Sequence, residues 1–242
     1  MVYIFNLLIA TPFYNGLVFL IGLLPYLDAG IIIIIFTIIV KIILLPLSIK
    51  ASKSQIEMKS TEKDLQVLKE KYKENKNELN VKTMEYYKEK GINPFAGILI
   101  IIIQLPILIG LYRVFLKSGL PEINQSLLYS FVTAPTLVDM MFLGSINIAE
   151  KSLFLAIISG LTTYFQVVYA TQTNLPASEG STQNELARAM SMQMKYFFPL
   201  LMAFISYTIS SAIALYIITS NIFAIFQEIY IRKKYHKSVT VV

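Results

Sequence analysis

The chain has 242 residues, of which 55% are hydrophobic and only 15% are charged. A single soluble core of this size does not need so much apolar side chain, so the excess must be solvated by lipid. The absence of cysteine excludes disulfides, thiolate metal sites and cysteine nucleophiles. The net charge of +6 is modest, and the position of the positive residues relative to the apolar segments is more informative.

The N-terminal segment, residues 1–29, is apolar but is interrupted by Asn6, Pro12, Asn15 and Pro25. Such interruptions favour a helix that lies in the outer membrane interface. A helix that crosses the membrane, and so adds a sixth span and moves the N-terminus inside, is the competing interpretation.

The first clear transmembrane helix is predicted over residues 30–49, an apolar run that contains one charge, Lys41. At about 1.5 Å rise per residue, crossing a hydrocarbon core of about 30 Å uses most of this run, so Lys41 lies inside the membrane. A charge at that depth costs about 2.5–3.5 kcal/mol on insertion scales and usually faces water or a partner. Lys41 therefore either reaches the interface along its flexible stem or lines a polar intramembrane groove.

Residues 50–93 change character abruptly: they are rich in lysine and in acidic residues, and they contain helix formers throughout. Apolar residues recur at helical spacing on both sides of a break at Asn75 to Asn77. This pattern predicts a cytoplasmic helical hairpin with two facing apolar stripes, and a merely solvated helix pair is the plainer alternative. The expected hairpin contacts are Met58, Leu65, Leu68, Tyr72, Met84 and Tyr87.

The second span, residues 94–117, follows Gly91-Ile-Asn93-Pro94, which combines a helix stop, an N-cap asparagine and a proline at the first helical position. Residues 118–150, interrupted by prolines, are expected to form an extracytoplasmic segment. The third span is predicted over residues 151–172. A cytoplasmic loop is predicted over the polar residues 173–194.

The last apolar stretch, residues 195–230, is too long for one comfortable span and short for two. Positive residues flank both ends, so the positive-inside rule places both ends in the cytoplasm and predicts transmembrane helices 4 and 5 that turn near Ser210 and Ser211. Residues 231–242 form a basic cytoplasmic tail. The predicted fold class is therefore all-α: a polytopic membrane protein with five transmembrane helices, the N-terminus outside and the C-terminus inside.

Several polar side chains within the other spans are candidates to share a groove with Lys41. Each of them, taken alone, is as well explained by a helix–helix hydrogen bond. Together with a lysine they favour a wet concavity, which would hold polar parts of a translocating polypeptide away from lipid. These candidates are Gln104, Thr162, Gln166, Ser220 and Asn221, with Gln227 nearer the membrane boundary.

Three stretches form a specific set of motifs: Lys41 to Ser52, Tyr87 to Tyr112, and Ala214 to Gln227. In order and spacing, over about residues 10–235, they resemble the YidC/Oxa/Alb family of membrane protein insertases, and among them a short bacterial YidC without the large periplasmic domain. The resemblance implies five core helices around a hydrophilic groove, and it adds Tyr216 to the groove residues. Lys41 stands where the family usually has arginine, so the charge is kept but the planar, bidentate fork is lost.

The resemblance further implies an insertase and chaperone that inserts and helps fold proteins of the bacterial cytoplasmic membrane, with no enzymatic activity, metal or cofactor. The implied partners are nascent membrane proteins, the ribosome, signal recognition particle components, the Sec translocon and the lipid bilayer. A small transporter or channel is the runner-up, because it would use the same polar groove. A membrane-bound enzyme ranks third, since no cluster of His, Asp or Glu lies at membrane depth.

Overall fold

A computed structural model describes residues 5–93, 106–114, 120, 122–171 and 192–239. This part of the chain is mostly helical, with one short antiparallel ribbon of β1 (Met141–Phe142) and β2 (Ile146–Asn147). Four of the described segments are long and apolar enough to cross a membrane: Asn6–Leu23, Ala29–Ser54, Leu153–Ala170 and Ser211–Lys234. The all-α, multi-pass class predicted from the sequence is therefore confirmed.

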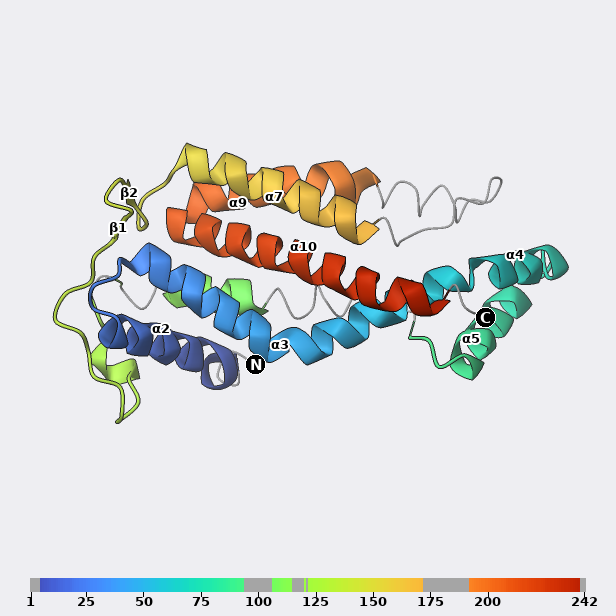
Figure 1. Ribbon diagram of the computed structural model, residues 1–242, viewed down its shortest axis with the longest axis horizontal. Helices are drawn as coiled ribbons and strands as arrows, with labels where there is room; N and C mark the ends of the chain where they lie inside the picture. Colours follow the sequence, from blue (N-terminus) through green and yellow to red (C-terminus); the bar gives the residue numbers. More distant parts are fainter. Residues whose placement is uncertain (1–4, 94–105, 115–119, 121, 172–191, 240–242) are drawn as a thin grey trace.

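The longest helix is α3 (Ala29–Ser60), which runs along most of the length of the molecule (Figure 1). The carboxylate of Asp28 accepts a hydrogen bond from the Ile31 amide at 2.9 Å, so it satisfies one of the free donors at the start of this helix. The helix continues without a break past residue 50, where the sequence turns from apolar to charged, and contains Pro46. Beyond it, α4 (Glu62–Lys71) and α5 (Lys76–Glu89) form a hairpin at one end of the molecule, here called the hairpin end.

Three helices form a second layer beside α3 (Figure 1). They are α7 (Leu153–Thr171), α9 (Phe198–Ile209), which continues the short helix η3 (Gln193–Phe197), and α10 (Ser211–Val239). The backbone is extended at Ser210, and this separates α9 from α10. Helix α7 packs against both α9 and α10, and α10 also packs against α3. Of the expected second span, the structure describes residues 106–114, which are helical.

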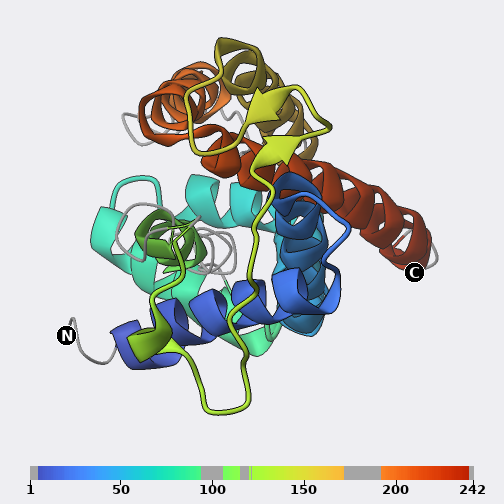
Figure 2. The same ribbon diagram turned by 90° about the vertical axis from the view of Figure 1, so that its left-hand side faces the viewer.

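The N-terminal helix consists of η1 (Asn6–Ala10) and α2 (Thr11–Leu23). Figure 2 shows α2 lying across the bundle, whereas α7 and α9 are seen nearly end-on. Asn15, which interrupts the apolar pattern, is buried, and its amide donates to the carbonyl of Leu127 at 2.8 Å and accepts from the Tyr129 amide at 2.6 Å. These hydrogen bonds to the loop offset the cost of burying the polar side chain.

The ribbon β1–β2 lies at the end of the molecule opposite the hairpin, here called the ribbon end (Figure 1). The chain around it bonds the first turns of both long helices: Ala29 donates to the carbonyl of Asp139 at 2.7 Å, and Ser211 donates through its backbone amide to the carbonyl of Glu150 at 2.7 Å. Side chains of α2, α3, α10 and residues 106–114 form the adjoining core. The ribbon end is therefore fastened through the backbone.

Candidate functional site

Lys41 lies near the middle of the apolar part of α3. It is twelve residues after Ala29, which corresponds to about 18 Å along the helix, and no other charged residue occurs between Ala29 and Lys50. Its side chain is half-buried, whereas Ile43, two residues later, is 68% exposed. The lysine therefore lies on a partly covered face of a helix that is apolar enough to cross a membrane.

Helices α3 and α10 run side by side in the same direction (Figure 1). The residue of α10 that lies at the level of Lys41 can therefore be found by counting along both helices. The amide of Gln227 donates a hydrogen bond to the hydroxyl of Ser48 at 2.6 Å, so these two residues meet across the interface. Seven residues, or two helical turns, before them on each helix lie Lys41 and Ser220. Lys41 is therefore at the level of Ser220, on the side of α3 that faces α10.

The polar residues of α10 are themselves organised. Tyr216 is 1% exposed and shares a side-chain hydrogen bond with Ser220, which is 2% exposed. The amide of Asn221 donates to the hydroxyl of Thr163 at 2.8 Å and to that of Thr162 at 3.3 Å. The structure thus joins Tyr216 to Ser220 and Thr162 to Asn221, and it shows that Asn221 connects α10 to α7.

A polar connection also joins α7 to α9. The hydroxyl of Ser159 on α7 donates to that of Ser206 on α9 at 2.8 Å, and Thr163 donates to the carbonyl of Ser159 at 2.7 Å. Sequence reasoning missed Ser48, Ser159, Thr163 and Ser206. Serine and threonine can bond the backbone of their own helix, so they occur in apolar helices without lowering the hydropathy much. The available signal was the four-residue spacing of Ser159 and Thr163, which places both on one face of the helix.

Besides Lys41 and the residues of these pairs, the predicted groove residues are Gln166 and Gln104. Gln166 on α7 is half-buried, one turn after Thr162. Gln104 lies outside the described residues. In the part of the chain that the structure describes, no group of three or more His, Asp or Glu could hold a metal ion.

The predicted hairpin contacts differ in burial. Leu65 is 8% exposed, Leu68, Tyr72 and Tyr87 are half-buried, and Met84 is 49% exposed. The side chain of Met58 lies outside the description. Among the predicted contacts whose side chains are described, Leu65 is therefore the most buried and Met84 the most exposed.

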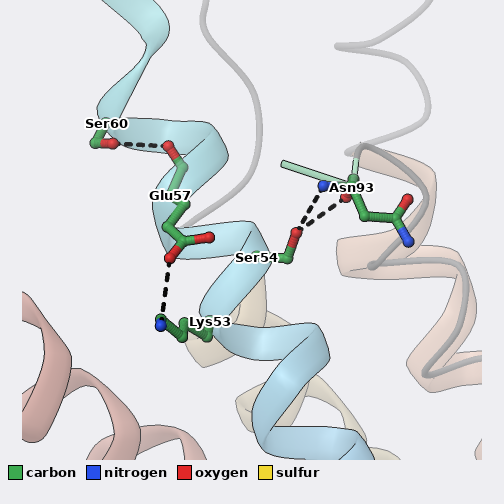
Figure 3. Close-up of polar contacts among 5 residues, drawn as sticks. All are labelled: Lys53, Ser54, Glu57, Ser60 and Asn93. Carbon is green, nitrogen blue, oxygen red and sulfur yellow. Dashed lines mark hydrogen bonds and ion pairs between the residues drawn. The ribbon is translucent and has the colours of Figure 1, made fainter. Parts of the chain in front are cut away.

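The hairpin is also held by polar contacts. The hydroxyl of Tyr86 donates to the carboxylate of Asp64, and partial burial together with this bond raises the pKa of Tyr86 to about 12. Because this pKa lies above the ordinary value of 10, the stabilisation is complete below pH 10 and is lost as the pH rises through about 12. At the base of the hairpin, Ser54 donates to the carbonyl of Asn93 at 3.2 Å and accepts from its amide at 3.0 Å (Figure 3).

Comparison with known proteins gives consistent results. Residues 21–238 match the family model described as 60Kd inner membrane protein. The chain is 37% identical over 205 residues to a membrane protein insertase YidC of Fusobacterium nucleatum, covering 85% of this chain and 86% of that protein. It is also 31% identical to a membrane protein insertase YidC of Clostridium tetani, over 86% of this chain and 84% of the relative. The chain therefore belongs to the YidC/Oxa family, whose model is that of the 60Kd inner membrane protein.

Proposed function

We propose that this protein is a membrane protein insertase and chaperone, which inserts and helps fold proteins in the bacterial cytoplasmic membrane without chemical catalysis and without a cofactor. Relatives whose similarity covers most of this chain are named membrane protein insertase. The observation that carries the proposal is the position of Lys41, a cation at membrane depth on the face of α3 turned toward Ser220 and the polar residues of α10.

The proposed mechanism uses a hydrophilic groove lined by Lys41, Gln104, Thr162, Gln166, Tyr216, Ser220 and Asn221. Polar parts of a client chain would otherwise cross hydrocarbon with unsatisfied hydrogen-bonding groups, at a cost of several kcal/mol each. The cation at Lys41 attracts acidic residues of a client's translocated tail. The apolar segment of the client then leaves along lipid-facing surfaces such as that of Ile43, which is 68% exposed.

The proposed topology places the hairpin end in the cytoplasm and the ribbon end outside. The lysine-rich helices α4 and α5 and the exposed Lys233 and Lys234 of α10 support this orientation. Residues 94–117 supply the second of five core spans, α9 and α10 the last two, and the N-terminal helix lies at the outer interface. The C-terminus is then inside and the N-terminus outside.

The proposed clients are nascent membrane proteins. The ribosome is a proposed partner because Lys233 and Lys234 are exposed near the end of α10. Their positive charges would contact the phosphate backbone of ribosomal RNA. Signal recognition particle components and the Sec translocon are proposed from the resemblance to the family alone.

Photocrosslinking to a stalled nascent chain tests the groove. A photoreactive amino acid replaces Lys41, Gln104, Gln166 or, as a control, Phe204, which is 65% exposed on the far helix α9. The client is a single-span membrane protein with an acidic tail, presented by ribosomes to the protein in proteoliposomes. Crosslinks from the groove positions but not from Phe204 are expected. Equal labelling at all four positions, or solute flux without any crosslink, would overturn the proposal, and the latter would favour a transporter.

A further inference from the structure

The interface between α3 and α10, which contains the level of Lys41 and Ser220, is fastened differently at its two ends. At the ribbon end both helices are bonded through their first turns to the same segment, residues 139–150, by backbone hydrogen bonds of 2.7–2.9 Å. Toward the hairpin end, the described residues of the two helices are joined by a side-chain bond, that of Gln227 with Ser48 at 2.6 Å. A side-chain bond opens by a rotamer change, whereas the backbone bonds require the first turns of the helices to move.

The helix α10 is held in place on its other side. Asn221 bonds the hydroxyls of Thr162 and Thr163, and Arg232, which is paired with Glu228 at 3.0 Å, donates to the carbonyl of Tyr169 near the end of α7. Helix α7 is in turn bonded to α9 through Ser159 and Ser206. These bonds make α7, α9 and α10 one unit, so a separation at the hairpin end moves α3.

The proline inside α3 gives this helix a point at which it can bend. Pro46, two residues before Ser48, has no N–H to donate to the carbonyl of Ile42, so the helix lacks one backbone hydrogen bond there. Beyond this point, Ser54 bonds both the amide and the carbonyl of Asn93, which closes the base of the α4–α5 hairpin (Figure 3). The segment from Ser54 to Asn93 is therefore closed at its base, and it would move together with the part of α3 after Pro46.

We propose that Ser48 and Gln227 are a positioning pair that latches the interface between α3 and α10 at the hairpin end, and that insertion requires this latch to open by bending of α3 at Pro46. The proposal rests on the proposed insertase function and specifies how a client reaches the level of Lys41. Movement of the hairpin carries the part of α3 that follows Pro46 away from α10, while the two helices stay together at the ribbon end. The site then opens from the side on which nascent chains arrive.

A reversible crosslink tests the latch, and the natural absence of cysteine makes the background clean. The full-length variant Ser48→Cys with Gln227→Cys is joined by a short bis-methanethiosulfonate, because the gap that a glutamine side chain fills is longer than a disulfide spans. The matched control is Ser159→Cys with Ser206→Cys, treated with the same reagent, since α7 and α9 stay together in the proposal. Insertion of the single-span client into proteoliposomes is measured before crosslinking, after it and after reduction.

We expect the Ser48–Gln227 crosslink to reduce insertion at least tenfold, with recovery on reduction, and the Ser159–Ser206 crosslink to leave it within twofold. Insertion at an unchanged rate by the Ser48–Gln227 crosslinked protein, or an equal loss in both pairs, would overturn the latch. If neither the uncrosslinked variants nor the natural protein inserts the client, the insertase function itself fails.

A second measurement does not depend on activity. In a protein with Ser220→Cys as the single cysteine, the added substitution Gln227→Leu removes the latch donor but preserves bulk. A water-soluble maleimide is expected to label this buried position several-fold faster in the presence of Gln227→Leu, whereas Ser159→Cys is labelled at the same rate with or without it. Equal labelling of Ser220→Cys in the two backgrounds would contradict the latch.

Discussion

A lysine in place of arginine at position 41 keeps a cation in the proposed groove but changes how it meets a carboxylate. The ammonium of lysine is a compact point charge on a flexible stem, whereas guanidinium offers two parallel donors in a rigid fork. Attraction of an acidic client tail needs charge and depth, and both are present here. The geometry of a bidentate pair is not required for the proposed mechanism.

The sign of this charge is therefore expected to matter more than its chemical form. Lys41→Arg should insert a client with an acidic tail at close to the natural rate, and Lys41→Glu should reduce insertion at least tenfold, because a like charge then faces the tail. Protease protection of the translocated tail in proteoliposomes measures both. A client whose tail carries lysines in place of its acidic residues should recover part of the loss in Lys41→Glu. Full activity of Lys41→Glu with the acidic client would show that the cation is not used.

Residues around Lys41 also show where sequence reasoning ends. The run from Ile31 to Ile43 is apolar at nearly every position, so it has no periodicity that separates a protein-facing side from a lipid-facing one. The structure buries Ile32 and Ile33 completely and leaves Ile43 68% exposed. Only the packing of α2, α10 and residues 106–114 around the helix determines which of these isoleucines meet lipid.

At the scale of the element, α7 and α9 approach closely through small residues. A Cβ atom added to Gly160 would lie 2.9 Å from the Cβ of Ala203 and 3.3 Å from the carbonyl oxygen of Pro199. Close approach lets Ser159 and Ser206 bond across the same interface. In lipid, where no hydrophobic effect drives helices together, such packing and hydrogen bonding are the main sources of association.

A methyl group at position 160 should therefore separate α7 from α9. We expect Gly160→Ala to lower the thermal unfolding midpoint in detergent by several degrees, corresponding to an overpacking cost of about 1–3 kcal/mol, despite the better helix propensity of alanine. The control is Gly22→Ala on α2, where the nearest atom to the added Cβ is the carbonyl oxygen of Thr133 at 3.7 Å. Gly22→Ala should leave the midpoint unchanged or raise it. An equal response of the two variants would mean that the α7–α9 contact is loose.

In the whole molecule, the two ends differ in charge and in how they are held together. The hairpin end carries the lysine-rich helices α4 and α5, and the ribbon end carries the β1–β2 ribbon with its backbone bonds to α3 and α10. Clusters of lysine are retained on the cytoplasmic side during insertion. The proposed orientation follows from this asymmetry.

Accessibility of single cysteines in intact cells measures the orientation. A membrane-impermeant maleimide should label Ser145→Cys, exposed at the ribbon end, and should label Lys73→Cys, exposed at the hairpin end, only after the cells are opened. An epitope placed before Met1 should be digested by external protease, as an interfacial N-terminal helix requires. Protection of the epitope in intact cells would instead show that the segment Asn6–Leu23 crosses the membrane as an additional span.

The class of this protein follows from its sequence. Solvation by lipid demands long apolar helices, which are visible in the composition, and the motifs from Lys41 to Gln227 identify the family. The sequence also singled out Thr162, Ser220 and Asn221, since polar residues within apolar runs are conspicuous. The partners of such residues become known only from the packed structure: Asn221 bonds Thr163, Asn15 bonds the loop at Leu127 and Tyr129, and Gln227 bonds Ser48. The physical reason is that hydropathy reports the depth of a residue in the membrane, whereas its partner depends on the rotation and register of helices that are distant in the chain.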